Sequence, residues 1–451
     1  MGKGPLPTQA PKERAFLVGV DLRREQAALT LKDSLEELAL LAETAGLSVV
    51  GEASQRLRHP HPKTFLRSGK INEVKSLVEE TLADVLLFDD ELSPRHQREL
   101  EKIFGDDVRI LDRSALILDI FAQHASTKEG ALQVELAQYE YRLPRLTRAW
   151  THLARQAGGG GGRTGSSGGV GLRGPGETQL ESDRRSIRNR ITQLKRELEK
   201  VRSHRGRYRS RRQRNEIPTI ALVGYTNSGK STLINQLSGA NVVVADKLFA
   251  TLDPITRRLE LPGGHQALVT DTVGFIQKLP ATLAAAFRAT LEEIAEADLL
   301  LHVVDISNPN AHAHAAIVHS TLQEIAVNEL PIVTALNKID ALQEDVEVHN
   351  LLDDFERAVP ISALTGEGVS TLLKVAEAEL YASFASIKVR LSYKDGRLIG
   401  LFHELGIVEN VEHQDSSVVM EGRVPQRVLA EFEPFEIHDE HDLVIDLSSI
   451  D

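Results

Sequence analysis

The sequence predicts a multidomain α/β protein built around a P-loop domain, and three observations lead to this prediction. The chain has 451 residues, too many for one ordinary hydrophobic core. Short β-rich runs alternate with amphipathic stretches in its first 128 residues and again after residue 217. A long stretch between these regions has helical periodicity and strong positive charge. We expect an N-terminal α/β domain at 1–128, an antiparallel helical hairpin at 129–215, a P-loop domain at 216–385 and a small C-terminal α+β domain at 386–451.

The composition excludes several classes of protein. Hydrophobic content of 41% and charged content of 26% are those of a globular protein. No apolar run approaches the roughly 18 residues that cross a bilayer, and the first twenty residues contain no stretch of signal-peptide length. Cysteine is absent, which excludes disulfides and cysteine-ligated zinc. We expect a cytoplasmic monomer without a membrane span.

The N-terminal region has the pattern of a parallel sheet covered by helices on both faces. It contains no G-x-G-x-x-G string, so a dinucleotide site has no support. The loop at 59–70 holds two histidines between prolines, and a rigid turn explains it better than a metal site because further ligands are missing. The expected strands are 15–20, 47–53, 84–90 and 107–112, and the expected helices are 34–45, 69–82, a helix opened by Ser93 and Pro94, and 115–124.

Two apolar seams with heptad spacing predict the hairpin. Pro144 interrupts the first seam and is expected to kink its helix or to leave one carbonyl unpaired. The first seam is Leu132, Leu136, Tyr139, Leu143, Leu146, Trp150 and Leu153, and the second is Ile187, Ile191, Leu194, Leu198 and Val201.

The turn and the second arm of this hairpin have unusual compositions. Residues 158–176 contain 11 glycines with two arginines and no acidic residue, which is typical of a flexible linker or of a tip that fits against phosphates. We favour the tip, because a hairpin needs only a short turn. From Ser182 to Arg214 there are 14 Lys and Arg against 3 Asp and Glu, although the whole chain has a net charge of −12. This basic arm predicts a polyanionic partner rather than an ordinary solvated helix face.

A P-loop begins the third domain. The run 219–224 (TIALVG) is typical of a buried strand, and GYTNSGKS at 224–231 follows it and opens a helix. The two glycines let backbone N–H groups face phosphates, Lys230 pairs with the β and γ oxygens, and Ser231 offers its hydroxyl to Mg²⁺. The predicted phosphate-binding residues are Gly224, Tyr225, Thr226, Asn227, Ser228, Gly229, Lys230, Ser231 and Thr232.

A second motif, DTVG at 271–274, follows another strand. Asp271 is expected to hold Mg²⁺ through water, and the Gly274 amide to sense the γ-phosphate. A threonine must close over the metal in the triphosphate state, and the segment before this motif offers Thr251 and Thr256. The nucleotide-binding residues predicted here are Phe249, Ala250, Thr251, Leu252, Asp253, Asp271, Thr272, Val273 and Gly274.

Two further motifs select the base. Asp340 of NKID can accept both N–H groups of the guanine edge, a contact that adenine does not offer. The predicted base-binding residues are Asn337, Lys338, Ile339 and Asp340, with Ser362, Ala363 and Leu364 behind the base. Four motifs in this order predict a P-loop GTPase domain that binds GTP and GDP with Mg²⁺.

One position in the second motif differs from many small GTPases. Where those proteins have a glutamine that orients water, this chain has Phe275, which cannot hydrogen-bond water. Slow intrinsic hydrolysis is therefore expected, with the missing group supplied by another side chain, a partner or a cation. Asn227 occupies a P-loop position at which some GTPases ligate potassium, and a loop-stabilising amide is the alternative.

Several segments resemble signatures of the HflX family of ribosome-associated GTPases, and the resemblance covers nearly the whole chain. It rests on LQVELAQYEYRLPRL (132–146), GLRGPGETQLESDRR (171–185), FATLDP (249–254) and DTVGFIQKLP (271–280). Ser228, where alanine is common, departs conservatively from the pattern.

The resemblance implies a function and some roles. It favours Thr251 over Thr256, so that Ser231, Thr251 and Asp271 would serve the metal and Lys230, Thr251 and Gly274 the reaction. It implies a GTPase, stimulated by the ribosome, that binds the large ribosomal subunit and its RNA and splits stalled ribosomes. A GTP-dependent assembly or anti-association factor is one alternative. ATP-driven RNA remodelling by the N-terminal domain is another, for which residues 1–128 hold no motif.

Overall fold

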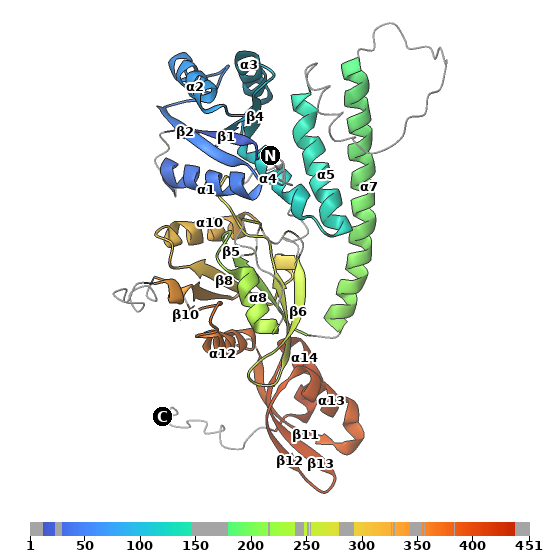
Figure 1. Ribbon diagram of the computed structural model, residues 1–451. Helices are drawn as coiled ribbons and strands as arrows, with labels where there is room; N and C mark the ends of the chain where they lie inside the picture. The colour runs from blue at the N-terminus through green and yellow to red at the C-terminus, as the bar shows by residue number, and fades with distance from the viewer. Residues whose placement is uncertain are drawn as a thin grey trace, which may run out of the picture.

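The structure is a computed structural model whose units follow one another along the chain (Figure 1). An N-terminal unit and a P-loop unit are stacked, two long helices lie beside them, and a small C-terminal unit follows below in the view. The structure describes residues 12–22, 29–146, 179–214, 217–239, 248–249, 252, 254–278, 293–325, 327, 330–342, 354–355, 357–382 and 384–437.

The N-terminal unit contains a four-stranded parallel sheet in the order β2-β1-β3-β4. Alternate residues of β1 point to opposite faces, so Ala15 and Leu17 pack under α1 and α4 whereas Phe16 and Val18 pack under α2 and α3. Both faces are thus covered, as the alternating pattern predicts. The bounds are β1 Arg14–Leu22, α1 Leu31–Thr44, β2 Ser48–Leu57, α2 Ser68–Thr81, β3 Val85–Phe88, α3 Pro94–Phe104, β4 Arg109–Asp112 and α4 Arg113–His124.

Side-chain caps fix where three of these helices begin. The Thr30 hydroxyl oxygen accepts a hydrogen bond from the Asp33 amide, and the Asp33 carboxylate accepts one from the Thr30 amide, forming a capping box at α1. Ser93 caps α3 directly before Pro94, and Asp112 caps α4 through the Ala115 amide. Each of these three helices therefore begins at the residue directly after its cap.

The predicted hairpin is formed by α5 (Lys128–Arg142) and α7 (Gln179–Arg214). The chain rises along α5 and returns along α7 to the strand β5, so the two helices lie side by side in opposite directions (Figure 1). Leu194 is fully buried between them, and Glu135 forms an ion pair with Arg190 at 2.8 Å. The apolar contact joins Leu132, Leu136, Tyr139, Ile191, Leu194, Leu198 and Val201.

Pro144 ends the first helix rather than kinking it. Residues Leu143–Arg145 form the short 3₁₀ turn η1 directly after α5, because proline lacks the N–H that a continuing helix needs. The seam positions Trp150 and Leu153 and the glycine-rich stretch 158–176 lie outside the described residues.

The P-loop unit has a six-stranded sheet in the order β10-β9-β8-β5-β7-β6, in which only the edge strand β6 is antiparallel. The helices α8 and α12 pack on one face and α10 on the other. The bounds are β5 Thr219–Gly224, α8 Lys230–Ser238, β6 Ile255–Glu260, β7 Gln266–Asp271, β8 Leu299–Asp305, α10 Ala311–Glu324, β9 Ile332–Asn337, η3 Ile339–Ala341, β10 Ala358–Pro360 and α12 Val369–Leu380.

The C-terminal unit is a three-stranded antiparallel sheet, β11-β13-β12, with two helices on one face. Its core centres on Phe402 and Phe432, whose ring centroids are 5.4 Å apart. The bounds are β11 Ala385–Ser392, η4 Tyr393–Asp395, α13 Gly396–Leu405, β12 Ile407–His413, β13 Ser417–Val424, α14 Gln426–Phe432 and η5 Glu433–Phe435. This is the α+β arrangement that the sequence predicts.

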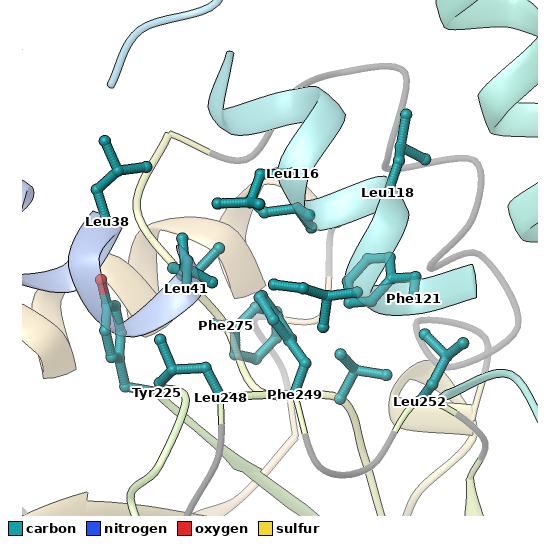
Figure 2. Close-up of a cluster of buried hydrophobic side chains, with 14 of the residues drawn as sticks. Leu38, Leu41, Leu116, Leu118, Phe121, Tyr225, Leu248, Phe249, Leu252 and Phe275 are labelled. Carbon is teal, nitrogen blue, oxygen red and sulfur yellow. The ribbon is translucent and has the colours of Figure 1, made fainter. Parts of the chain in front are cut away.

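One hydrophobic cluster joins the N-terminal unit to the P-loop unit. Figure 2 shows side chains of α1 and α4 meeting those that flank the P-loop and the DTVG motif. Phe121 of α4 meets Phe249 edge to face, with ring centroids 4.8 Å apart, and Leu41 and Phe275 are both buried in the same cluster. The two units thus share a core instead of meeting only at a polar surface. No helix among the described residues is both long and apolar enough to cross a membrane.

Candidate functional site

The P-loop lies between the carboxyl end of β5 and the start of α8. Its glycines are required by close packing: a Cβ on Gly224 would overlap the Val303 carbonyl oxygen, and one on Gly229 would overlap the Asn337 amide. Gly229 also has φ +96°, which favours glycine. Because α8 begins at Lys230, its N-terminal N–H groups face the loop, the arrangement that binds phosphate.

Lys230 is enclosed by the loop that it is predicted to serve. Its ammonium donates hydrogen bonds to the carbonyl oxygens of Gly224 at 3.1 Å and Tyr225 at 2.7 Å. Burial lowers the pKa of Lys230 to about 8, and the nearby Asp271 carboxylate opposes that shift. A phosphate here would give this buried cation the anionic partner that stabilises its charged form.

The residues predicted to serve the metal include one close pair. Ser231 Oγ donates to Asp271 Oδ2 at 2.8 Å, which joins the start of α8 to the end of β7. Both are hard oxygen ligands, and the described residues contain no group of three or more acidic, histidine or cysteine side chains that could hold a metal ion by themselves. This donor set fits Mg²⁺, which takes one or two protein oxygens and completes its shell with water and phosphate oxygens.

Gly274 of the DTVG motif lies directly against the P-loop. A Cβ on it would be 2.8 Å from Thr226 Cα and 3.1 Å from Lys230 Nζ, so only glycine fits here. The backbone of the next residue pairs with the loop: the Phe275 amide donates to Gly224 O at 3.0 Å, and the Thr226 amide donates to Phe275 O at 2.8 Å. The structure thus brings this motif and the P-loop together.

Of the two candidate threonines, Thr256 lies within β6, and its hydroxyl is 3.1 Å from that of Thr270 on the neighbouring strand. Thr251 lies outside the described residues, as do Ala250 and Asp253. Phe249 and Leu252 are both buried in the cluster shared with the N-terminal unit, as Figure 2 shows. Their side chains therefore contribute packing, and a role for Thr251 stays a prediction.

The base-selecting motifs lie at the ends of β9 and β10. The Asn337 amide donates to Ser228 O at 2.8 Å and accepts from the Ala363 amide at 2.9 Å, so it ties the P-loop to the third and fourth motifs. Lys338 has φ +70° and forms an ion pair with Asp305 at 2.7 Å.

The other residues of these motifs differ in exposure. Asp340 is exposed in η3, next to Ile339, whereas Ser362 is fully buried and accepts from the Thr365 amide. Leu364 is 73% exposed. The carboxylate of Asp340 is therefore accessible to a base.

The remaining predicted residues divide into two groups. Thr272 and Val273 are buried beside the P-loop, and the Thr272 hydroxyl donates to Leu222 O at 2.5 Å. Asn227 has φ +61° and lies at the tip of the loop, while Thr232 lies in the first turn of α8. The ligand contacts assigned to these residues stay predictions.

The side chain of Tyr225 does not face the phosphate-binding backbone. Its hydroxyl donates to Glu37 of the N-terminal unit, and its ring stacks on His314 at 3.9 Å between centroids. Sequence reasoning missed Glu37, because 188 residues separate the two partners and no motif links them. The same holds for the contacts of Gln277 with Ser34 of α1 and of Lys278 with Asp89, which follows β3.

Family models match consecutive segments along most of the chain. They are the GTP-binding GTPase N-terminal model at 32–122, the GTP-binding GTPase middle region at 124–212, the 50S ribosome-binding GTPase at 219–338 and the HflX C-terminal domain at 348–434.

Curated relatives extend the similarity over nearly the full length. A GTPase HflX of Lacrimispora saccharolytica is 44% identical over 93% of this chain and 95% of its own length, and one of Escherichia coli is 43% identical over 92% and 94%. This chain belongs to the HflX family. A solved GTP-binding protein from Sulfolobus solfataricus, in complex with GDP, is 25% identical over 81% of this chain and 98% of its own, with a TM-score of 0.43.

Membership in the HflX family explains the four motifs together. The protein is a GTPase that binds guanine nucleotides, and its family is ribosome-associated. The resemblance inferred from the sequence is confirmed over almost the whole chain.

Proposed function

We propose that this HflX-family GTPase binds the large ribosomal subunit and its RNA, and separates the subunits of stalled or idle ribosomes. Hydrolysis of GTP would be stimulated by the ribosome and would reset the protein, which acts as a cytoplasmic monomer. The observation that carries the proposal is the helix α7, 36 residues long, whose sequence contains 14 of the 53 Lys and Arg of the chain.

The described part of α7 supports an RNA-binding surface. Its inner face is apolar and packs on α5 through Leu194, while Arg188, Arg196 and Lys200 are exposed on the outside. Among the described residues, Glu135 and Glu140 of α5 pair with Arg190 and Lys195 of α7. A cationic helix of this length contacts phosphates along a nucleic acid without reading bases.

Phe275 supports dependence on a partner. It is buried in the core shared with the N-terminal unit, so its side chain does not reach toward water at the phosphate site. The group that orients the attacking water therefore comes from elsewhere. Docking on a ribosome is the simplest way to supply it.

We also propose the metal ions of the reaction. Ser231, Thr251 and Asp271 would hold Mg²⁺, which neutralises phosphate charge during transfer. Asn227 would ligate a potassium ion that adds to this neutralisation. Lys230 then orients the β and γ phosphates, and the Gly274 amide holds the γ-phosphate in line with water.

Sedimentation of 70S-type ribosomes tests the proposal. With the protein and GTP, we expect the 70S peak to shift toward free subunits. A chain trimmed of residues 158–174 should retain GTP hydrolysis and large-subunit binding and lose the shift. Binding to the large subunit without any shift, in both proteins, would instead indicate an anti-association or assembly factor. Binding to no subunit contradicts the proposal.

A further inference from the structure

An ion pair joins the end of β8 to the NKID motif. Lys338 Nζ lies 2.7 Å from Asp305 Oδ2, and the two side chains are 31% and 15% exposed. The parallel pairing of β8 with β9 places Asp305 opposite Asn337, and the Ile306 amide donates to Asn337 O at 3.1 Å. The sheet itself therefore holds Asp305 beside the start of the motif.

The turn after β8 orients the Asp305 carboxylate. Its Oδ1 accepts hydrogen bonds from the Ser307 amide at 3.0 Å and from the Ser307 hydroxyl at 2.6 Å. Its Oδ2 is left for Lys338, so each oxygen has its own partner. The backbone of Lys338 is held as well, because this residue has φ +70° directly before the 3₁₀ turn η3.

The stability of the fold does not explain this ion pair. Both side chains are partly exposed, and water screens such pairs so that they contribute little to folding. The position of the pair, inside one of the base-selecting motifs, indicates a role in nucleotide binding instead.

The carboxylate that is predicted to read guanine lies two residues after Lys338. Asp340 is exposed in η3, and its carboxylate has no hydrogen bond or ion pair with any other residue that the structure describes. Two hydrogen bonds from the guanine edge need both of its oxygens. A lysine without a fixed partner would be attracted to this carboxylate in the same turn, because opposite charges a few ångströms apart attract even at the surface. The pair with Asp305 keeps Lys338 away from Asp340.

We propose that Asp305 is a specificity-determining positioning residue: by holding Lys338, it leaves Asp340 unpaired and open to the N1–H and N2–H groups of guanine. It acts through Lys338 and not by touching the base. A purine without the 2-amino group needs only one oxygen of Asp340, so its binding gains less from Asp305. The proposal rests on the base-reading role predicted for Asp340 and does not depend on the proposed action on ribosomes.

The affinities for GDP and for IDP, whose base lacks the 2-amino group, test this proposal in the full-length protein. Asp305→Asn keeps an oxygen for Ser307 and turns an NH₂ group, which cannot accept a hydrogen bond, toward Lys338. By titration calorimetry we expect the affinity for GDP to fall by about threefold to tenfold, the cost of ordering one long side chain on binding. The affinity for IDP should fall less, so the ratio of the two affinities decreases.

Lys338→Met separates positioning from a direct effect of Asp305. Without the ammonium there is nothing for Asp305 to hold, so Asp305→Asn added to Lys338→Met should change neither affinity further. Additive losses in the double variant would overturn the proposal. An equal fall of both affinities in Asp305→Asn would also overturn it, since a distorted turn weakens every purine nucleotide alike. A ratio near one in the unmodified protein would do the same, because Asp340 would then not read the 2-amino group.

Glu379→Gln is the matched control. Glu379 forms a similarly exposed ion pair with Arg357 at 3.0 Å in the same unit, but Arg357 precedes β10 whereas the base-selecting motifs lie at the ends of β9 and β10. This variant should leave both affinities unchanged. Thermal unfolding of Glu379→Gln and Asp305→Asn should differ little from that of the unmodified protein. A large loss of stability in Asp305→Asn alone would assign the pair to folding and contradict the proposal.

Discussion

At the scale of single residues, the site depends on how closely its groups approach one another. A Cβ on any of Gly224, Gly229 or Gly274 would be too close to a neighbouring residue. The P-loop is therefore closely packed against the NKID and DTVG motifs. Lys230 is buried at their centre and satisfied by two backbone carbonyl oxygens. Nucleotide binding must therefore exchange these internal contacts for phosphate contacts.

The buried lysine predicts a proton linkage of GDP binding. With a pKa of about 8, Lys230 is half deprotonated at pH 8 in the free protein, and phosphate oxygens restore its charge. Binding should take up about half a proton at pH 8 and about nine-tenths at pH 9. The affinity for GDP should accordingly fall as pH rises above 8. Calorimetry in buffers of different ionisation enthalpy measures the uptake, and a value near zero at both pH values would contradict the lowered pKa of Lys230.

At the scale of elements, the hairpin shows what periodicity predicts and where it stops. Heptad spacing assigned Leu136 to the first seam and Leu194 to the second, and both lie in one apolar cluster in the structure. The helix of the first arm ends next to Pro144, although the apolar spacing in the sequence continues beyond it. Periodicity reports which face is apolar, whereas the missing N–H of a proline decides whether the helix can continue.

Leu194→Ala tests the packing of the hairpin. The side chain is fully buried, and its truncation should cost about 2–5 kcal/mol. Amides of α5 and α7 that open with the hairpin should then exchange at least about 30-fold faster. Gln193→Ala, at the neighbouring exposed position, should change exchange little. Similar rates in the two variants would show that the seam does not hold the helices together.

At the scale of the whole molecule, the sequence predicted the units better than the contacts between them. Strand–helix alternation and the four motifs were enough to predict the parallel sheet of the N-terminal unit and the P-loop domain, because those signals are local. The shared core of Phe121, Phe249 and Phe275 has no local signal: each residue simply looks apolar. The ion network of Glu37, Asp89 and Arg113 has no local signal either, because Arg113 is 76 residues from Glu37 and 24 residues from Asp89 in the sequence.

The shared core connects the nucleotide site to the unit that carries the hairpin. The segments that are predicted to respond to nucleotide pack on the unit from which the hairpin extends, so the nucleotide site and the hairpin are connected through one set of contacts. A particle that engages the hairpin therefore acts on the same contacts that hold residues 274–278. Stimulation of hydrolysis by a docked partner is the prediction that this connection supports.

The rate of GTP hydrolysis with and without purified large ribosomal subunits tests the central claim most directly. We expect slow hydrolysis by the protein alone and stimulation by about 10³-fold or more on large subunits, the range reached when a partner supplies a missing catalytic group. Isolated small subunits serve as the matched control and should stimulate little. An unchanged rate with large subunits at saturating concentration would contradict the account, although GTP binding through the four motifs would remain.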